Sequence, residues 1–215
     1  IKSFFYGFHQ NKMDIYKLRG VYMNLNKNKT KRQIKLETVV SHRQANIVVV
    51  LEDLHDPHNA AAIARTVEGF GIQNLHLIFE HEPSFNPKKI GKSTSSSANK
   101  WLTFHSWHTT KDCFDNLKQE GYVIIGTTLT PDAVNLYEYA WPQKIALVFG
   151  NEHNGLSEYA TQQCDTKIMI PMQGMIQSFN VSVSVGIVLG EVLRVRSKKK
   201  DEERYISETE QALLL

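Results

Sequence analysis

The chain has 215 residues, of which 41% are hydrophobic and 22% charged, and it contains two cysteines. A chain of this size can bury a full hydrophobic core, and its cysteine content excludes a disulfide framework or a zinc site built on paired cysteines. Its longest apolar stretch, Val181–Leu193, is too short to cross a bilayer, and the first dozen residues do not resemble a signal peptide. We therefore expect one domain with extensions, in a reducing, cytoplasmic setting and without a membrane.

The net charge of +3 hides an uneven distribution along the chain. Residues 1–35 sum to +8, residues 36–193 to −6 and residues 194–215 to +1. Clusters of this kind neutralise phosphates in nucleic-acid-binding arms, but they also occur as solvated ends. The candidate RNA-binding residues are the basic ones nearest to the central region, namely Lys27, Lys29, Lys31, Arg32, Lys35, Arg194 and Arg196.

Strand-like and helix-like segments alternate along the chain. Apolar, β-branched runs predict strands at Asn46–Leu51, Asn74–Phe79, Lys100–Phe104, Tyr122–Thr127, Lys144–Phe149 and Lys167–Ile170. Helical spacing of apolar residues predicts helices at Asn59–Phe70, Thr109–Glu120, Ser157–Cys164, Val181–Arg196 and Ser207–Leu214. This alternation indicates an α/β fold with a mainly parallel sheet.

Several common site types do not fit. Gly91-Lys92-Ser93 has Asn86 where a phosphate-binding loop needs its first glycine, and no G-x-G-x-x-G occurs. The cluster of His55, Asp56 and His58 lacks a clear further ligand, so we expect no metal. The turn that starts at Gly150 has no nucleophile for hydrolase chemistry.

Three polar segments follow predicted strands, where open parallel sheets build their ligand sites. The first contains Asn59, which we expect to cap a helix, and Arg65. The other two run from Gly150 to Gly155 and from Ile170 to Ser182. By themselves these segments are also consistent with ordinary turns and helix caps.

The order and spacing of the three segments resemble the motifs of the SpoU branch of the SPOUT RNA methyltransferases. The first resembles N-x-x-A-I-x-R-T, the second G-x-E-x-x-G and the third I-P-M-x-G-M-x-x-S-L-N-V-S. The third motif is long and specific, and it departs from the pattern only where Phe179 replaces leucine. Within the branch, the match is closest to the tRNA guanosine-18 2′-O-methyltransferases.

The resemblance implies a C-terminal deep trefoil knot, a homodimer with an active site made by both subunits, and S-adenosyl-L-methionine as the methyl donor. It also implies a division into a basic extension (1–35), a methyltransferase domain (36–196) and a C-terminal extension (197–215). The residues that it places in the cofactor pocket are Thr127, Gly150, Ile170 and Ser178. It makes Arg65 the catalytic arginine, arranged with the loops by Asn59, Glu152, Ser178 and Asn180.

The role of Arg65 stays open at this stage. The family is usually described with this arginine as the general base, but a guanidinium stays protonated near neutral pH. Arg65 could instead bind an RNA phosphate and stabilise charge, which is the role that we favour on physical grounds. Two alternatives to a tRNA substrate also stay open: a 2′-O-methyltransferase acting on ribosomal RNA, and a catalytically silent RNA-binding protein.

Overall fold

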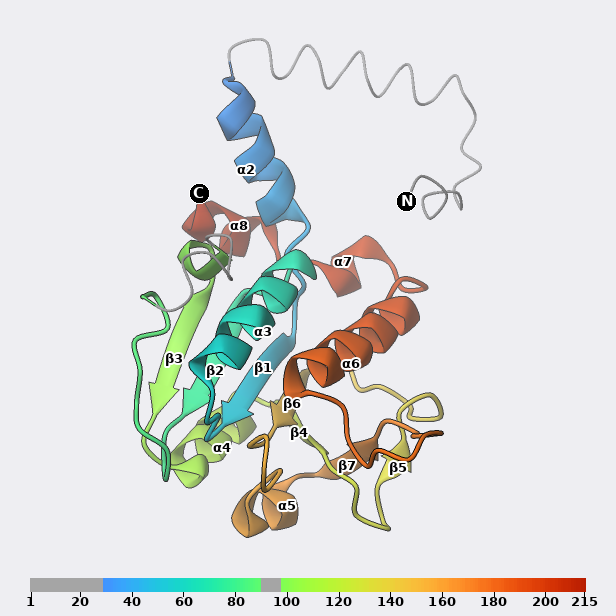
Figure 1. The fold of residues 1–215 in the computed structure, drawn as a ribbon. Coiled ribbons are helices and arrows are strands. Elements are labelled where there is room, and N and C mark those ends of the chain that lie inside the picture. The colour runs from blue at the N-terminus through green and yellow to red at the C-terminus, as the bar shows by residue number, and fades with distance from the viewer. Residues whose placement is uncertain (1–28, 90–97) are drawn as a thin grey trace.

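The computed structural model describes residues 29–89 and 98–215 (Figure 1). Its centre is a seven-stranded sheet in the order β3-β2-β1-β6-β4-β7-β5, in which all the pairings between these strands are parallel. The predicted α/β fold with a mainly parallel sheet is therefore confirmed. The strands are β1 (Ile47–Glu52), β2 (Asn74–Ile78), β3 (Thr103–Trp107), β4 (Val123–Thr127), β5 (Val134–Asn135), β6 (Ile145–Phe149) and β7 (Thr166–Met169).

Helices cover both faces of the sheet. On one face α3 (Pro57–Gly69) and α6 (Val181–Arg196) pack against each other, and Figure 1 shows them side by side in front of the strands. The other face carries α4 (Thr110–Gln119) and α5 (Glu158–Gln163). Every residue of β1 is buried, as a parallel strand with helices on both sides requires. Neighbouring β1 residues therefore serve different cores: Val49 packs on the α3 side and Val50 on the α4 side.

The two ends of the described chain lie together. The helix α2 (Lys31–Ser41) starts with a capping box between Thr30 and Gln33, and it packs against α8 (Glu208–Leu214). The main chain of Ala45 donates to the carbonyl of Arg204 at 2.8 Å, close to the short helix α7 (Asp201–Arg204). The domain boundary expected after residue 35 thus falls inside a continuous helix.

Most predicted elements occur with ends that differ by one or two residues, and two expectations were wrong. The third strand starts at Thr103 instead of Lys100, because Ala98–Lys100 forms a 3-10 turn. Asp56, and not Asn59, caps α3, since its carboxylate accepts a hydrogen bond from the main chain of His58 at 2.8 Å. Asn59 lies inside the first turn, which leaves its amide free for another contact. The elements α2, β5 and α7 were not predicted.

The strand β7 lies between β4 and β5, although it follows both in the sequence. This order brings the segments after β4, β6 and β7 to the same edge of the sheet. The trefoil knot expected in this part of the chain stays a prediction. No helix within the described ranges has the length and hydropathy needed to span a membrane.

Candidate active site

The segments after β1 and β6 leave neighbouring strands toward opposite faces of the sheet. The first leads into α3 and the second into α5, which lie on different sides. Such a switch point opens a crevice at the carboxyl edge of a parallel sheet. A cavity of about 740 Å³ lies at this edge. Its lining comes from the segments after β4, β6 and β7 and from the start of α6, and includes Thr128, Leu129, Asn151, His153, Leu156, Met172 and Phe179.

All four residues predicted to hold the cofactor line this cavity. They are contributed by three different strand ends, and are Thr127, Gly150, Ile170 and Ser178. The hydroxyl of Thr127 donates to the carbonyl of Val148 at 3.0 Å, which ties the end of β4 to β6. The structure therefore brings these four residues together, while their role in binding a cofactor stays a prediction.

The wall formed by residues 150–156 depends on a glycine at position 150. The main chain of Asn151 forms a pair of hydrogen bonds with Gly155, at 2.8 and 2.9 Å, which closes the loop tightly. A Cβ atom on Gly150 would lie 2.2 Å from the carbonyl carbon and oxygen of Gly155. These neighbours are backbone atoms, so no side chain could move aside to make room. Gly155 has a φ of +69°, which a glycine adopts without strain.

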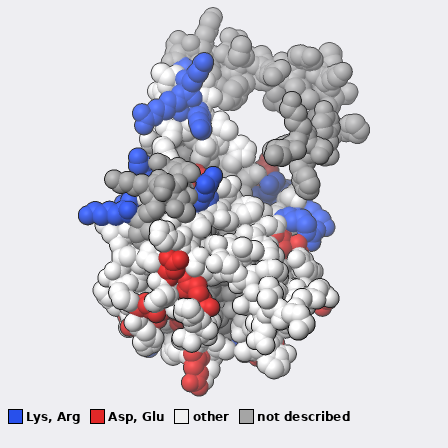
Figure 2. Space-filling view, viewed as in Figure 1, with Lys and Arg blue, Asp and Glu red and all other residues white. Residues whose placement is uncertain are grey.

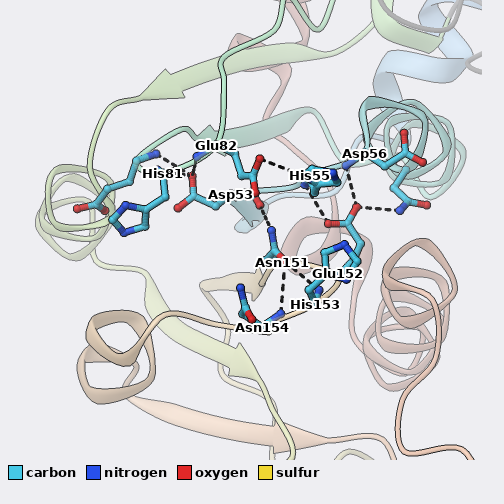
Figure 3. Close-up of polar contacts among 11 residues, drawn as sticks. Asp53, His55, Asp56, His81, Glu82, Asn151, Glu152, His153 and Asn154 are labelled. Carbon is cyan, nitrogen blue, oxygen red and sulfur yellow. Dashed lines mark hydrogen bonds and ion pairs between the residues drawn. The ribbon is translucent and has the colours of Figure 1, made fainter.

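The carboxylate of Glu152 joins this wall to the start of α3 (Figure 3). It accepts hydrogen bonds from the main chain of His55 at 2.9 Å and of Asp56 at 3.2 Å, and from the side chain of Asn59 at 2.8 Å. The side-chain amide of Asn180 in turn donates to the side-chain oxygen Oδ1 of Asn59 at 3.1 Å. Three of the four residues predicted to arrange the active site therefore form one network, namely Asn59, Glu152 and Asn180.

Electrostatics in this network favour an ionised Glu152. Burial tends to raise the pKa of its carboxyl group, but the hydrogen bonds from Asn59, His55 and Asp56 outweigh burial and hold the pKa below its usual value. Both oxygens of the carboxylate already accept hydrogen bonds. Glu152 is therefore suited to fixing the loops rather than to taking a proton from a substrate.

Arg65 and Ser178 lie outside the network. Ser178 is exposed on the cavity wall. Arg65 is exposed on α3, six residues beyond Asn59, which places the two side chains about 9 Å apart along the helix and on different faces. Within the described chain, Arg65 makes no hydrogen bond or ion pair and is not part of the cavity lining. Its guanidinium group is thus accessible to a phosphate.

Comparisons with known proteins match this arrangement. The profile of the SpoU rRNA Methylase family covers residues 46–190. The tRNA (guanosine(18)-2′-O)-methyltransferase of Thermus thermophilus is 36% identical over 78% of this chain and 84% of its own length. The enzyme with the same name from Escherichia coli is 30% identical over 86% of this chain and 80% of its own length. The chain belongs to the SpoU family.

Solved structures of SpoU proteins agree with the fold. The TrmH/SpoU tRNA modifying enzyme of A. aeolicus superposes with a TM-score of 0.77 at 33% identity, covering 86% of this chain and 93% of that one. The family resemblance stated from the three motifs is confirmed. Another relative is named for ribosomal RNA. The 23S rRNA (guanosine-2′-O-)-methyltransferase of Neisseria meningitidis is 29% identical over 80% of this chain and 68% of its own length.

The basic residues predicted to bind RNA in this SpoU protein fall into distinct groups. Lys31, Arg32 and Lys35 are exposed on α2, and Figure 2 shows basic side chains over this helix, with acidic ones lower on the same face. Lys29 is exposed but forms an ion pair with Glu37. Arg194 is also exposed, and it pairs with the buried Glu191. Lys27 lies outside the described residues.

The prediction for Arg196 was wrong. Its side chain is only 2% exposed, and its guanidinium group donates to the carbonyls of Ala45, Asn46 and Gln143. Burial lowers the pKa of Arg196 to about 10. These carbonyls precede β1 and β6, so Arg196 fastens the end of α6 to the amino edge of the sheet. The sequence signal was misleading because a basic cluster does not show which of its members points inward.

Proposed function

We propose that the chain transfers a methyl group from S-adenosyl-L-methionine to the ribose 2′-hydroxyl of guanosine 18 in tRNA. The main support is that one cavity gathers all four predicted cofactor residues, and that Glu152 joins its wall to the helix of Arg65. The names of the relatives from Thermus thermophilus and Escherichia coli agree with this substrate.

The cavity suits such a cofactor. Its volume of about 740 Å³ lies within the range of small-molecule sites, and its lining combines hydroxyl, amide and backbone groups with apolar side chains. The residues that would hold the cofactor are Thr127, Gly150, Ile170 and Ser178. When bound, S-adenosyl-L-methionine supplies a methyl group already activated on a positively charged sulfur, so the reaction needs no metal.

The chain's own residues then orient the RNA. A ribose 2′-hydroxyl is a weak nucleophile, and its proton would pass to water or to an RNA phosphate oxygen as the methyl group is transferred. Arg65 presents an exposed guanidinium group that can bind a phosphate through paired hydrogen bonds. We infer that Arg65 holds the RNA backbone at the reacting nucleotide, while Glu152 and Asn59 fix the start of its helix.

The homodimer belongs to the same proposal. Arg65 does not line the cavity of its own chain, whereas the third motif and the start of α6 expose apolar side chains. A symmetric partner would cover this apolar surface and let the arginine of one subunit serve the cavity of the other. We also place the enzyme in the cytoplasm, because its two cysteines are free and its proposed substrate is tRNA. The exposed apolar residues are Met175, Ile176, Phe179 and Val183.

A transfer assay with methyl-labelled S-adenosyl-L-methionine tests the proposal. A tRNA transcript should accept the label, and a matched transcript with a single 2′-deoxyguanosine at position 18 should not, since the accepting hydroxyl is missing. Mass spectrometry of nuclease fragments locates the methyl group. Equal labelling of the two transcripts would refute the assigned position. Labelling of ribosomal RNA alone would favour the alternative substrate, and cofactor binding without transfer to any RNA would favour a silent binding protein.

A further inference from the structure

Asp53 lies at the centre of the contacts in Figure 3, although it is not part of the cavity lining or of the three motifs. It follows β1 directly and is 7% exposed. Its oxygen Oδ1 accepts hydrogen bonds from three successive main-chain amides, those of Glu80 at 2.8 Å, His81 at 3.0 Å and Glu82 at 3.2 Å. Asp53 therefore holds the turn after β2 through one carboxylate oxygen.

The main chain of Asp53 contacts both the end of β2 and the loop after β6. Its amide donates to the carbonyl of Ile78 at 3.1 Å, and its carbonyl accepts from the side chain of Asn151 at 2.6 Å. Its φ of +49° lies in the left-handed region, which aspartate tolerates better than most residues with a side chain. One residue thus joins the turn after β2 to the loop after β6, and its backbone conformation sets the direction in which the chain leaves β1.

Asn151 extends this connection into the cavity wall. Besides donating to Asp53, its side-chain oxygen accepts from the main chain of His153 at 2.8 Å and of Asn154 at 3.3 Å. The next residue, Glu152, binds the main chain of His55 and Asp56. The segment 53–56 is therefore attached to the cavity wall at both of its ends.

We propose that Asp53 is a positioning residue for methyl transfer, which holds the cavity wall and the start of α3 in one arrangement by tying both to the turn after β2. The proposal rests on the proposed function for its kinetic consequence. The helix that leaves this segment carries Asn59 and Arg65. Misplacing reacting groups by about 1 Å can cost on the order of 10²-fold in rate. A residue that fixes the helix relative to the wall thus affects the rate without touching the substrate.

Three variants separate the effect of losing the hydrogen bonds to the Asp53 carboxylate from other effects of a substitution. Asp53→Gly removes the carboxylate but allows the positive φ, and we expect kcat to fall about tenfold or more while KM for S-adenosyl-L-methionine changes less than about threefold. Asp53→Asn keeps one carbonyl oxygen for the three amides and should restore kcat to within about threefold of the wild type. The control is Asp165→Ala, which removes another carboxylate that accepts a main-chain hydrogen bond, from Ile124, at the opposite edge of the sheet.

Hydrogen exchange supplies a measurement that does not need activity. In Asp53→Gly, the amides of Glu80–Glu82 and those of the 151–155 loop should exchange faster together, and Asp165→Ala should change neither. Faster exchange confined to Glu80–Glu82 would overturn the coupling to the wall. A kcat of Asp53→Gly close to that of the wild type, or an equal loss in Asp165→Ala, would overturn the positioning role. If the wild type transfers no methyl group, the proposed function fails, while the exchange result still decides whether Asp53 couples the two segments.

Discussion

Arg65 differs from Asn59, Glu152 and Asn180 in having no hydrogen bond or ion pair that fixes its side chain within the described chain. If it binds an RNA phosphate, Arg65→Ala should lower kcat by about 10² or more, since removing a group that stabilises charge commonly costs this much. The affinity for S-adenosyl-L-methionine should stay within about twofold of the wild type, because Arg65 is not in the cavity lining. Single-turnover transfer and calorimetry measure the two quantities.

Arg65→Lys is the matched control for this prediction. Lysine keeps the charge but cannot form the paired hydrogen bonds of a guanidinium group, so it should recover only part of the lost rate. A fully active Arg65→Ala enzyme would contradict the role, and a loss of cofactor binding would move Arg65 into the cofactor site.

At the scale of single residues, the sequence predicted which residues share one site better than it predicted where each side chain lies. Motif spacing placed Asn59, Glu152 and Asn180 in one site, and they do form one network. It did not reveal Asp53, because a single acidic residue after a strand is common and its hydrogen-bond donors lie 27 to 29 residues further along the chain. Arg196 failed for the same reason: its buried carbonyl partners lie far away in the sequence.

Among the elements, the loop after β6 has the least room for change. Gly150→Ala would place a Cβ atom 2.2 Å from the main chain of Gly155, so the loop must open. We expect a loss of cofactor affinity of at least about tenfold, because misplaced backbone groups no longer meet the ligand. Gly69→Ala at the end of α3, where a Cβ atom would meet nothing within 4 Å, is the control and should leave affinity unchanged. Calorimetry on both variants decides, and normal binding by Gly150→Ala would contradict the prediction.

The strands β2 and β3 carry two stacked histidines on the α4 side of the sheet, of which His76 is buried and His105 is partly buried. The ring of His76 stacks on His105 at 4.4 Å, and it accepts a hydrogen bond from the indole of Trp107 at 3.1 Å. Burial, with a smaller contribution from His105, lowers the pKa of His76 from 6.5 to about 3. In the folded protein this ring therefore stays neutral over the whole range in which an unfolded histidine takes up a proton.

This shift predicts how stability depends on pH. Below pH 6.5 the unfolded chain binds a proton at His76 that the folded chain does not, so the stability contributed by the neutral ring is present above pH 6.5 and is lost as the pH falls toward about 3. One such group contributes a slope of up to about 1.4 kcal/mol per pH unit. His76→Gln, which keeps an acceptor for Trp107, should flatten the slope between pH 6 and about 4 in urea unfolding experiments. An unchanged slope would show that His76 takes up its proton over the same pH range in the folded and the unfolded protein.

The elements themselves were largely predictable, because both faces of the sheet are buried and its strands are continuous apolar runs. Ile145–Phe149 is an example, with all five residues buried. Prediction failed where the apolar pattern is weak or short. The helix α2 buries only Val40, so it shows little apolar periodicity, while β5 has two residues and α7 has four, too few to show a period. The strand order could not be predicted from the apolar pattern either, since nothing in the composition of β7 indicates that it lies between β4 and β5.

At the scale of the whole molecule, the exposed apolar surface next to the cavity predicts a dimer. Gly186 and Gly190 lie four residues apart on α6, a spacing that favours close helix approach, but a Cβ atom on Gly186 would lie 3.9 Å from the side chain of Thr66 on α3 in its own chain. Ile176 and Val183, which are 63% and 47% exposed and outside the cavity lining, are better candidates. Replacing both with glutamate should convert the dimer to a monomer in light scattering at micromolar concentration, because charges would be buried without partners.

Tyr159→Glu is the control for the dimer, since this exposed aromatic residue lies on α5, on the other side of the sheet. It should leave the oligomeric state unchanged. A wild-type protein that is monomeric and active at micromolar concentration would contradict the dimer altogether.

The charge distribution of the whole molecule predicts where tRNA affinity arises. Residues 36–193 sum to −6 and should repel a polyanion, whereas α2 exposes Lys31, Arg32 and Lys35 on the side where Figure 2 shows basic side chains. Each phosphate contact contributes about 0.7–0.9 to the slope of log affinity against log salt concentration. If each of the three residues makes one contact, replacing all three with glutamine should flatten this slope by about 2.1–2.7. The capping box of α2 is kept, and cofactor affinity should not change.

The matched control replaces Lys111 and Lys118 on α4. An unchanged slope in the α2 variant would leave these residues as a solvated surface and move tRNA recognition to other parts of the chain.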